Sequence, residues 1–227
     1  MYHWRGSVDG SGWVVDLAFT DREGGAGPAL AAKLAPSATL VQVHQVHGRH
    51  VLDAAEVSTA QPRCDHCDLA QADGLITTST DFLLEMRAAD CLPVLLADVE
   101  AGVIGAAHAG RAGMVAGVAP ATVAAMRERG AEQITAWLGP HICGACYEVP
   151  EALRAEVGVA VPASFSTTSW GSPALDIGAG VRAQLEEDGV SVVDHSACTR
   201  ESQALESYRR DGAASGRQAG LIRLRRR

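Results

Sequence analysis

Hydrophobic residues along the chain gather in short runs that are separated by polar or glycine-rich turns. Two of these runs, Leu92–Ala97 and Val103–Ala107, are uninterrupted and flank the polar turn Asp98–Gly102. Apolar runs of this length are typical of strands that are buried on both faces. Because the turn between them is short, the pattern predicts a central antiparallel hairpin.

Further strands and helices are predicted from the same pattern. Strands are expected within residues 1–20, from 39 toward Gly48, and at 72–77, 82–87, 133–138, 190–193 and 219–224. Helices are expected at 29–34, 114–129, 150–157 and 175–188, and a polar turn at 208–212. Pro120 lies inside the second helix and predicts a kink or a break there. Strands and helices do not strictly alternate, which favours an α+β fold in which helices cover packed sheets.

The length and net charge of the chain exclude some classes of function. A chain of 227 residues fits one large domain, and its net charge of −8 argues against binding to a nucleic-acid backbone. The basic cluster at residues 223–227 is expected to be a frayed, solvated tail. No apolar run approaches the ~20 residues of a membrane span, and the first residues do not resemble a signal peptide. We therefore expect a cytoplasmic protein with reduced cysteines.

Reactive side chains flank the predicted hairpin. Cys91 precedes its first strand and His108 ends its second, so antiparallel pairing brings both to one end, beside the glycine-rich turn Gly110–Gly113. His44, His47 and His50 are spaced by three and would share a face only in a helix, which Gly48 and the neighbouring valines disfavour. At most one or two of these three histidines are therefore expected to face the reactive site beside Cys91 and His108.

The pattern leaves several interpretations open. His47, Cys91 and His108 suit Zn²⁺ with an open fourth position, or they are two hydrogen-bonded histidines and one buried thiol. In a cysteine hydrolase, Cys91 is the nucleophile and His108 its base, with Asp73 or Asp90 orienting the histidine. The pairs Cys64–Cys67 and Cys143–Cys146 form a structural zinc site or are unrelated loop thiols; their long separation favours the second interpretation.

Several motifs, taken together, resemble the YfiH-like family, whose members carry the laccase domain. They occur in order, from about residue 15 to residue 224: Phe19–Gly25, Gln45–Gly48, Ala72–Thr77, Ala89–Leu96, His108–Gly110, Gly139–Pro140, Cys146–Val149, Tyr208–Gly212 and Gly216–Gly220. The resemblance implies a single domain over residues 1–227, built as an α-β-β-α sandwich of two packed mixed sheets with outer helices. It also implies a zinc ion held by His47, Cys91 and His108.

The same resemblance implies an activity. Members of the family were named multicopper polyphenol oxidases, but one His/His/Cys set favours zinc over a multicopper oxidase centre. The implied function is a zinc-dependent purine nucleoside phosphorylase acting on adenosine, inosine, guanosine and methylthioadenosine, with adenosine deaminase activity as a further expectation. The alternatives are a cysteine-nucleophile hydrolase that edits a peptidoglycan precursor and a non-enzymatic, zinc-stabilised protein.

Substrate-binding residues follow from the implied reaction. Phosphate is expected to bind at Arg22 and at Arg209 or Arg210, because guanidinium groups bind phosphate in a bidentate manner. Tyr147 or Tyr208 is a candidate for stacking on the purine base. The expected partners are a purine nucleoside and phosphate, with no nucleic acid and no membrane; the oligomeric state stays open. The chain departs from the family at Arg111-Ala112, where members usually have Trp-Arg, and in the short segment between residues 25 and 41.

Overall fold

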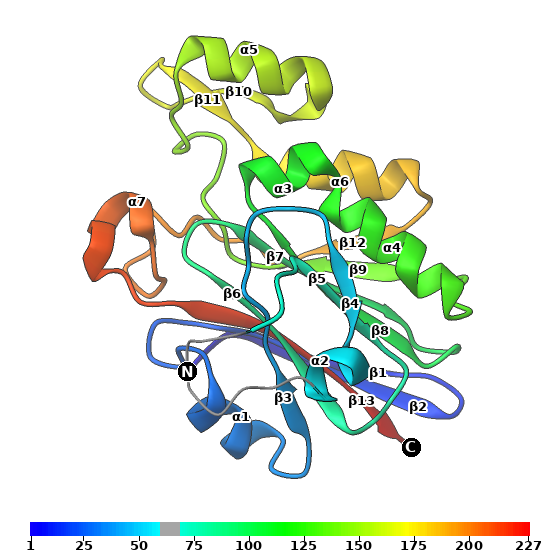
Figure 1. Cartoon of the computed structure of the whole chain (residues 1–227). Coiled ribbons are helices and arrows are strands. Elements are labelled where there is room, and N and C mark those ends of the chain that lie inside the picture. Colours follow the sequence, from blue (N-terminus) through cyan, green and yellow to red (C-terminus); the bar gives the residue numbers. More distant parts are fainter. Residues whose placement is uncertain (60–68) are drawn as a thin grey trace.

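Two β-sheets pack face to face in the computed structural model, which describes residues 1–59 and 69–227 (Figure 1). The first sheet has the order β1-β2-β13-β6-β3, and its neighbours are antiparallel except for the parallel pair β3–β6. Its strands, in sheet order, are β1 (Tyr2–Asp9), β2 (Trp13–Thr20), β13 (Gln218–Arg226), β6 (Phe82–Ala88) and β3 (Thr39–Val41).

The second sheet has six strands in the order β12-β9-β7-β8-β5-β4. The outer pairs β12–β9 and β4–β5 are parallel, whereas the inner pairs are antiparallel, so the sheet is mixed. Its strands, in sheet order, are β12 (Ser191–Asp194), β9 (Thr135–Leu138), β7 (Leu92–Asp98), β8 (Val103–Ala109), β5 (Gly74–Thr77) and β4 (Val51–Asp53).

Helices cover the outer faces of both sheets, which confirms the predicted α-β-β-α arrangement. The helix α1 (Pro28–Leu34) packs on the five-stranded sheet, while α3 (Arg111–Ala116), α4 (Val118–Glu128) and α6 (Ile177–Glu187) lie over the six-stranded sheet. Figure 1 shows α5 (Glu151–Ala160) together with the short hairpin of β10 (Phe165–Thr167) and β11 (Pro173–Leu175) beyond α3. The remaining short elements are α2 (Ala54–Thr59), α7 (Tyr208–Asp211) and the 3₁₀ turns Pro162–Ser164 and Gly212–Ala214.

Side-chain alternation divides the interior into layers. Successive residues of a strand point to opposite faces, so Leu17 and Phe19 of β2 enter the core between the sheets while Ala18 packs under α1. In β7 both faces are apolar: Leu95 points between the sheets, and Val94 packs under the outer helices. This double burial is the reason that β7 and β8 are continuous apolar runs.

The predicted central hairpin is confirmed. Strands β7 and β8 pair antiparallel, with Pro93 opposite His108 and Leu92 opposite Ala109. Cys91 and His108 therefore lie at the same end of the hairpin. At the opposite end, the carboxylate of Asp98 is 3% exposed and closes the turn.

The local structure differs from the sequence-based picture at three places. The long helix breaks at Gly117, which has φ 81° and separates α3 from α4, whereas Pro120 sits in the first turn of α4, where its missing N–H has no helical partner to lose. The strand expected to reach Gly48 ends at Val41, followed only by an isolated bridge at His44. Further along, β4 and α2 occupy residues 51–59, where the hydrophobic pattern predicted neither element.

The C-terminal arginines form part of β13, so the expected solvated tail is also wrong. Arg225 forms an ion pair with Asp16 of β2 at 2.5 Å, and the guanidinium of Arg226 lies 3.6 Å from the ring centroid of Trp13. Both contacts join β13 to β2, its antiparallel neighbour. None of the described helices is long and apolar enough to cross a lipid bilayer.

Asp98 generates a stability prediction. Its Oδ1 accepts the N–H groups of Glu100 and Ala101 at 3.1 and 3.0 Å, and its Oδ2 accepts those of Glu132 and Gln133, both at 2.7 Å. Burial acts to raise the pKa of Asp98, but these four hydrogen bonds outweigh it and lower the pKa below its usual value. The carboxylate therefore fastens both the β7–β8 turn and the loop that leads into β9.

We expect Asp98→Asn to lower the free energy of unfolding by about 1–3 kcal/mol at pH 7, because the amide keeps only one acceptor oxygen. Since the folded-state pKa is depressed, the stabilisation is complete above the unfolded-state value of about 4 and is lost as the pH falls through the folded-state pKa. Urea unfolding at pH 7 and in the acid range measures both effects. The matched control is Asp9→Asn on exposed β1, and an Asp98→Asn difference that stays constant into acid contradicts the prediction.

Candidate metal centre and active site

Three potential metal ligands converge at the end of the central hairpin. Cys91 directly precedes β7, His108 belongs to β8, and His47 lies in the irregular segment after β3. One side-chain ligand atom from each lies within 4.8 Å of the others, and the two imidazole centroids are 4.9 Å apart. The structure thus brings together the three residues singled out from the sequence.

A buried carboxylate positions two of these three residues. Asp73 is fully buried, and its Oδ1 lies 2.9 Å from Nδ1 of His108, which leaves Nε2 of that ring for the cluster. The same carboxylate accepts the backbone N–H groups of Val46, His47 and Gly48 at 3.2, 3.0 and 2.7 Å. These bonds hold His47 in a left-handed conformation, with φ 61°, that a residue with a side chain rarely adopts.

The cluster has the electrostatics of an ion pair. Burial acts to raise the pKa of Cys91, but hydrogen bonds and charge from His108 and His47 outweigh it and lower the pKa to about 6. Burial acts to lower the pKa of His108, but Asp73 and Cys91 outweigh it and raise the pKa to about 9. At neutral pH the thiol is therefore a thiolate, which is the form that binds metals and attacks electrophiles.

The space beside the cluster fits a metal ion. A Cβ atom built on Gly110 falls 2.5 Å from Nδ1 of His47 and 3.0 Å from Sγ of Cys91, so only glycine leaves this side of the cluster open. Two imidazoles and one thiolate suit zinc or another borderline-soft transition metal, and three protein ligands leave a coordination position free.

A cavity of about 720 Å³ opens beside the cluster. Its polar lining includes the cluster itself, the flanking Asp90 and Gln45, and a group of aromatic and basic side chains: His44, Arg87, Tyr147, Tyr208, Arg209 and Arg217. Such a volume is typical of a small-molecule site. Its three arginines, Arg87, Arg209 and Arg217, are side chains of the type that binds anionic groups.

The three arginines singled out from the sequence lie in different places. Arg209 lines the cavity, where its guanidinium lies 5.0 Å from the ring centroid of Tyr147. Arg210 instead donates hydrogen bonds to the carbonyls of Thr199, Ser202 and Leu205, each within 2.8 Å. Arg22 forms ion pairs with Asp211 at 2.5 Å and Glu206 at 3.4 Å. Neither Arg22 nor Arg210 lines the cavity.

Sequence reasoning did not single out two cavity arginines, Arg87 and Arg217. Arg87 is the penultimate residue of β6 and lies four residues before Cys91, and Arg217 lies in the motif Gly216–Gly220. Two features of the sequence could have identified them: Arg87 is close to Cys91 along the chain, and Arg217 belongs to a family motif.

The departure at Arg111-Ala112 is located next to the cluster. Arg111 is the first residue of α3 and lines a smaller pocket of about 330 Å³ together with His47, Cys91 and Tyr147. An arginine thus reaches the site from the first position of the helix.

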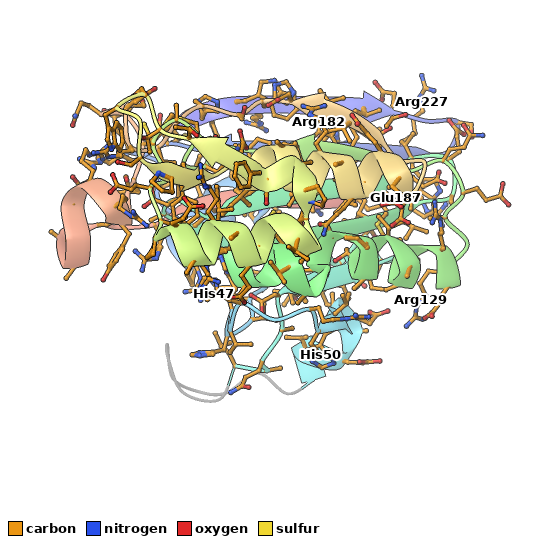
Figure 2. The ribbon with its side chains drawn as sticks, turned by 90° about the horizontal axis from the view of Figure 1, so that it is seen from above. His47, His50, Arg129, Arg182, Glu187 and Arg227 are labelled. Carbon is orange, nitrogen blue, oxygen red and sulfur yellow. The ribbon has the colours of Figure 1, made fainter. Side chains whose placement is uncertain are left out.

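The other sequence candidates do not belong to the three-residue cluster. Asp90 does not orient His108, because its carboxylate accepts Oγ1–H of Thr199 and the N–H of Arg209, both at 2.6 Å. His44 lines the cavity, whereas Nδ1 of His50 contacts the carbonyl of Gln71 at 3.1 Å. Figure 2 shows His47 and His50 at separate points along one flank of the molecule. Cys64 and Cys67 lie outside the described residues.

Comparisons with known proteins give a consistent result. A family model described as multi-copper polyphenol oxidoreductase laccase matches residues 27–225. A Streptomyces coelicolor protein named purine nucleoside phosphorylase is 48% identical over 190 residues, which cover 82% of this chain and 76% of that protein. A Mycobacterium tuberculosis protein of the same name is 42% identical over 190 residues, covering 82% and 73%.

Solved structures share the fold. A Neisseria meningitidis protein superposes with a TM-score of 0.79 at 26% identity, covering 97% of this chain and 98% of that one. The Bacillus licheniformis protein YfiH superposes with a TM-score of 0.75 at 22% identity, covering 96% and 98%. These matches extend over almost the whole chain, including both sheets.

Asp73 generates a prediction about metal affinity. We expect Asp73→Asn to weaken metal binding by about 10–100-fold, because the amide no longer accepts all four hydrogen bonds that position His47 and His108. Titration against a competing chelator measures the change. Asp81→Asn, at an exposed turn before β6, is the control; equal affinity of both variants and the parent contradicts the positioning role of Asp73.

Gly110 provides a steric test of the same site. Its φ of −81° suits alanine, so Gly110→Ala changes the space beside the cluster without straining the backbone. We expect the added methyl group to reduce the bound metal to less than half of the parent's content, because it overlaps the region of His47 Nδ1. Elemental analysis measures the metal. Gly12→Ala, at an open position, is the control, and full metal content in Gly110→Ala contradicts the assignment.

Proposed function

We propose that this chain, which belongs to the multi-copper polyphenol oxidoreductase laccase family, is a zinc-dependent purine nucleoside phosphorylase. The family match confirms the resemblance to YfiH-like proteins that the motifs indicated. The observation that carries the proposal is the position of the His47–Cys91–His108 cluster in the wall of an arginine-lined cavity. The relatives named purine nucleoside phosphorylase support the same reaction class.

The arginines of the cavity supply a phosphate site. Arg209 is the predicted phosphate ligand that lines the cavity, and Arg87 and Arg217 provide further positive charge. The position of Arg209 is well defined: its Nη1 donates to the carbonyl of Glu148 at 2.8 Å, and its backbone N–H donates to Asp90. The remaining guanidinium N–H groups are available for a phosphate oxygen pair.

The tyrosines of the cavity supply a surface for the base. Tyr147 is half-buried between the two pockets, whereas Tyr208 is 58% exposed at the cavity edge. A purine stacked on either ring keeps its polar edges free for hydrogen bonding. Tyr147 is the favoured platform, because it lines both pockets and its ring centroid lies 5.0 Å from the guanidinium of Arg209, the expected phosphate ligand.

Phosphorolysis needs a phosphate oxygen to bond to C1′ of the sugar while the bond from C1′ to the purine nitrogen breaks. The electron pair of that bond leaves with the purine. The arginines hold the phosphate and reduce its repulsion from the departing group. A bound zinc ion supplies a Lewis acid with one open coordination position, and His47, Cys91 and His108 are the residues that would hold it. Among the described residues, this is the one group that combines two imidazoles with a thiolate, which favours zinc over the several copper ions of a multicopper oxidase.

Inosine is the substrate that tests the proposal. We expect hypoxanthine release that requires phosphate, is lost in Cys91→Ser, and is abolished by a strong chelator and restored by Zn²⁺. In Arg209→Gln, we expect the KM for phosphate to rise by about tenfold or more, because a charge-assisted hydrogen-bond pair is lost. Coupled oxidation of hypoxanthine measures the rate.

Arg129→Gln is the matched control, because that arginine pairs with Asp53 and does not line the cavity. Its KM for phosphate is expected to equal that of the parent. Protein that contains no tightly bound zinc, together with a fully active Cys91→Ser variant, overturns the proposal. Release of ammonia from adenosine in the absence of phosphate tests the deaminase activity, which converts adenosine and water to inosine and ammonia.

A cysteine hydrolase acting on a peptidoglycan precursor is the second candidate. Cys91, His108 and Asp73 form a chain of nucleophile, base and orienting carboxylate, and the pKa of Cys91 is lowered to about 6. This candidate predicts release of a dipeptide from a muramyl precursor that survives chelation, while inosine remains intact. If neither substrate reacts and chelation unfolds the chain, a structural zinc protein is the better description.

A further inference from the structure

A second group of metal-ligating side chains lies outside the His47–Cys91–His108 cluster. It consists of Cys143, Cys146, Cys198 and Glu201, whose four ligand atoms lie within 4.8 Å of one another. Sγ of Cys146 is 3.2 Å from Oε1 of Glu201. We call these four residues the thiol cluster.

The thiol cluster is built from two tight turns, each of which contributes two ligands three residues apart. In the first turn, the N–H groups of Cys146 and Tyr147 both donate to the carbonyl of Cys143 at 3.0 Å. In the second, the N–H of Ser202 donates to the carbonyl of Cys198 at 3.0 Å, which brings Glu201 to the same side as Cys198. Paired ligands on short turns are the usual construction of a structural zinc site.

A β-bridge fixes the two turns against each other. His141, two residues before Cys143, pairs in parallel with Cys198: its N–H donates to the carbonyl of Ala197, and its own carbonyl accepts the N–H of Thr199, both at 3.1 Å. The ligand pairs are therefore preorganised by the backbone. About 50 residues of chain separate the two turns, so a shared ion would close a large loop.

The carboxylate of the thiol cluster has a thiol as its hydrogen-bond partner. Within residues 1–59 and 69–227, no lysine or arginine forms an ion pair with the carboxylate of Glu201, whose neighbour is a thiol. Cys146 is 4% exposed and Cys143 and Cys198 are half-buried. Three sulfurs and a carboxylate in one partly buried place form a donor set that suits a divalent cation such as zinc, which binds thiols with release of their protons.

We propose that the thiol cluster is a second, structural zinc site with a Cys₃Glu ligand set. Tetrahedral zinc with Zn–S bonds of about 2.3 Å separates neighbouring ligand atoms by roughly 3.8 Å, so side-chain shifts of about 1 Å or less close the site. All four positions are taken by protein ligands. This distinguishes the site from the three-ligand set at the hairpin, which keeps one position open.

The position of the site gives it a role in shaping the cavity. In each turn, the residue directly after a cysteine ligand reaches the active site: Tyr147 follows Cys146 and lines the cavity, and Thr199 follows Cys198 and donates to the carboxylate of Asp90 at 2.6 Å. Asp90 in turn precedes Cys91. A zinc ion at the thiol cluster therefore stiffens the wall that carries Tyr147 and Arg209.

Zinc content of single-site variants tests the proposal. After exposure to a weak chelator, elemental analysis is expected to find two zinc ions per parent chain, one in Cys91→Ser, one in Cys146→Ser and none in the double variant. Parent protein with cobalt in place of zinc is expected to show a thiolate-to-cobalt charge-transfer band that Cys146→Ser weakens more strongly than Cys91→Ser. Loss of the second ion is expected to lower the melting midpoint by roughly 5 °C or more.

Two further variants keep the test decisive. The double change Cys64→Ser, Cys67→Ser is expected to retain two zinc ions, because those thiols are outside the proposed ligand set. Glu201→Gln, at an exposed position, is expected to weaken the second zinc by about tenfold in chelator competition, and it gives an answer if Cys146→Ser fails to fold.

Three further results would decide whether the thiol cluster binds zinc. One zinc ion in the parent, lost in Cys91→Ser and retained in Glu201→Gln, overturns the second site. A disulfide among Cys143, Cys146 and Cys198, seen as a mass two daltons lower and a reduced thiol count, also overturns it. One zinc ion in the parent that persists in Cys91→Ser and is lost in Cys146→Ser supports the thiol cluster and speaks against the metal centre at the hairpin.

Discussion

The carboxylate of Asp73 joins parts of the chain that are distant in sequence. It lies at the start of β5, accepts a hydrogen bond from His108 on β8, and binds three consecutive N–H groups of the segment that carries His47. A fully buried charge is costly unless its hydrogen-bonding capacity is filled, so its burial favours the arrangement of these segments that supplies the four donors. The same requirement that makes the carboxylate tolerable in the interior places both imidazoles against the thiol of Cys91.

The sheets restrict buried polar groups to the ends of the central strands. The central strands β7 and β8 are apolar on both faces, so polar chemistry is confined to their ends. At one end Asp98 gathers four N–H groups and contributes to stability; at the other, Cys91 and His108 meet Asp73 and the cavity. The two aspartates use the same physical device, a buried carboxylate saturated by backbone donors, and differ in whether a titratable partner is included.

Much of this arrangement could be predicted from the sequence, and the omissions have physical causes. The double-sided apolar runs identified the hairpin, and its register fixed Cys91 and His108 at one end. His47 could not be placed by local pattern, since its left-handed conformation depends on Asp73 from another strand. The association of Cys198 and Glu201 with Cys143 depends on a bridge between loops about 50 residues apart, a contact with no periodic signal. Gly117 broke the helix where Pro120 was expected to, because proline is tolerated in a first turn.

The position of β13 has a consequence for how the polypeptide is made. This strand lies between β2 and β6 in the five-stranded sheet, although it is the last strand in chain order. While the ribosome is still translating, β2 and β6 have no partner on the sides that β13 will fill, and apolar residues such as Phe19 and Leu84 have only part of their final core. Unpaired strand edges of this kind are sites of aggregation. The nascent chain thus depends on β13 to close the sheet, and its unpaired strand edges stay open to aggregation until that strand emerges.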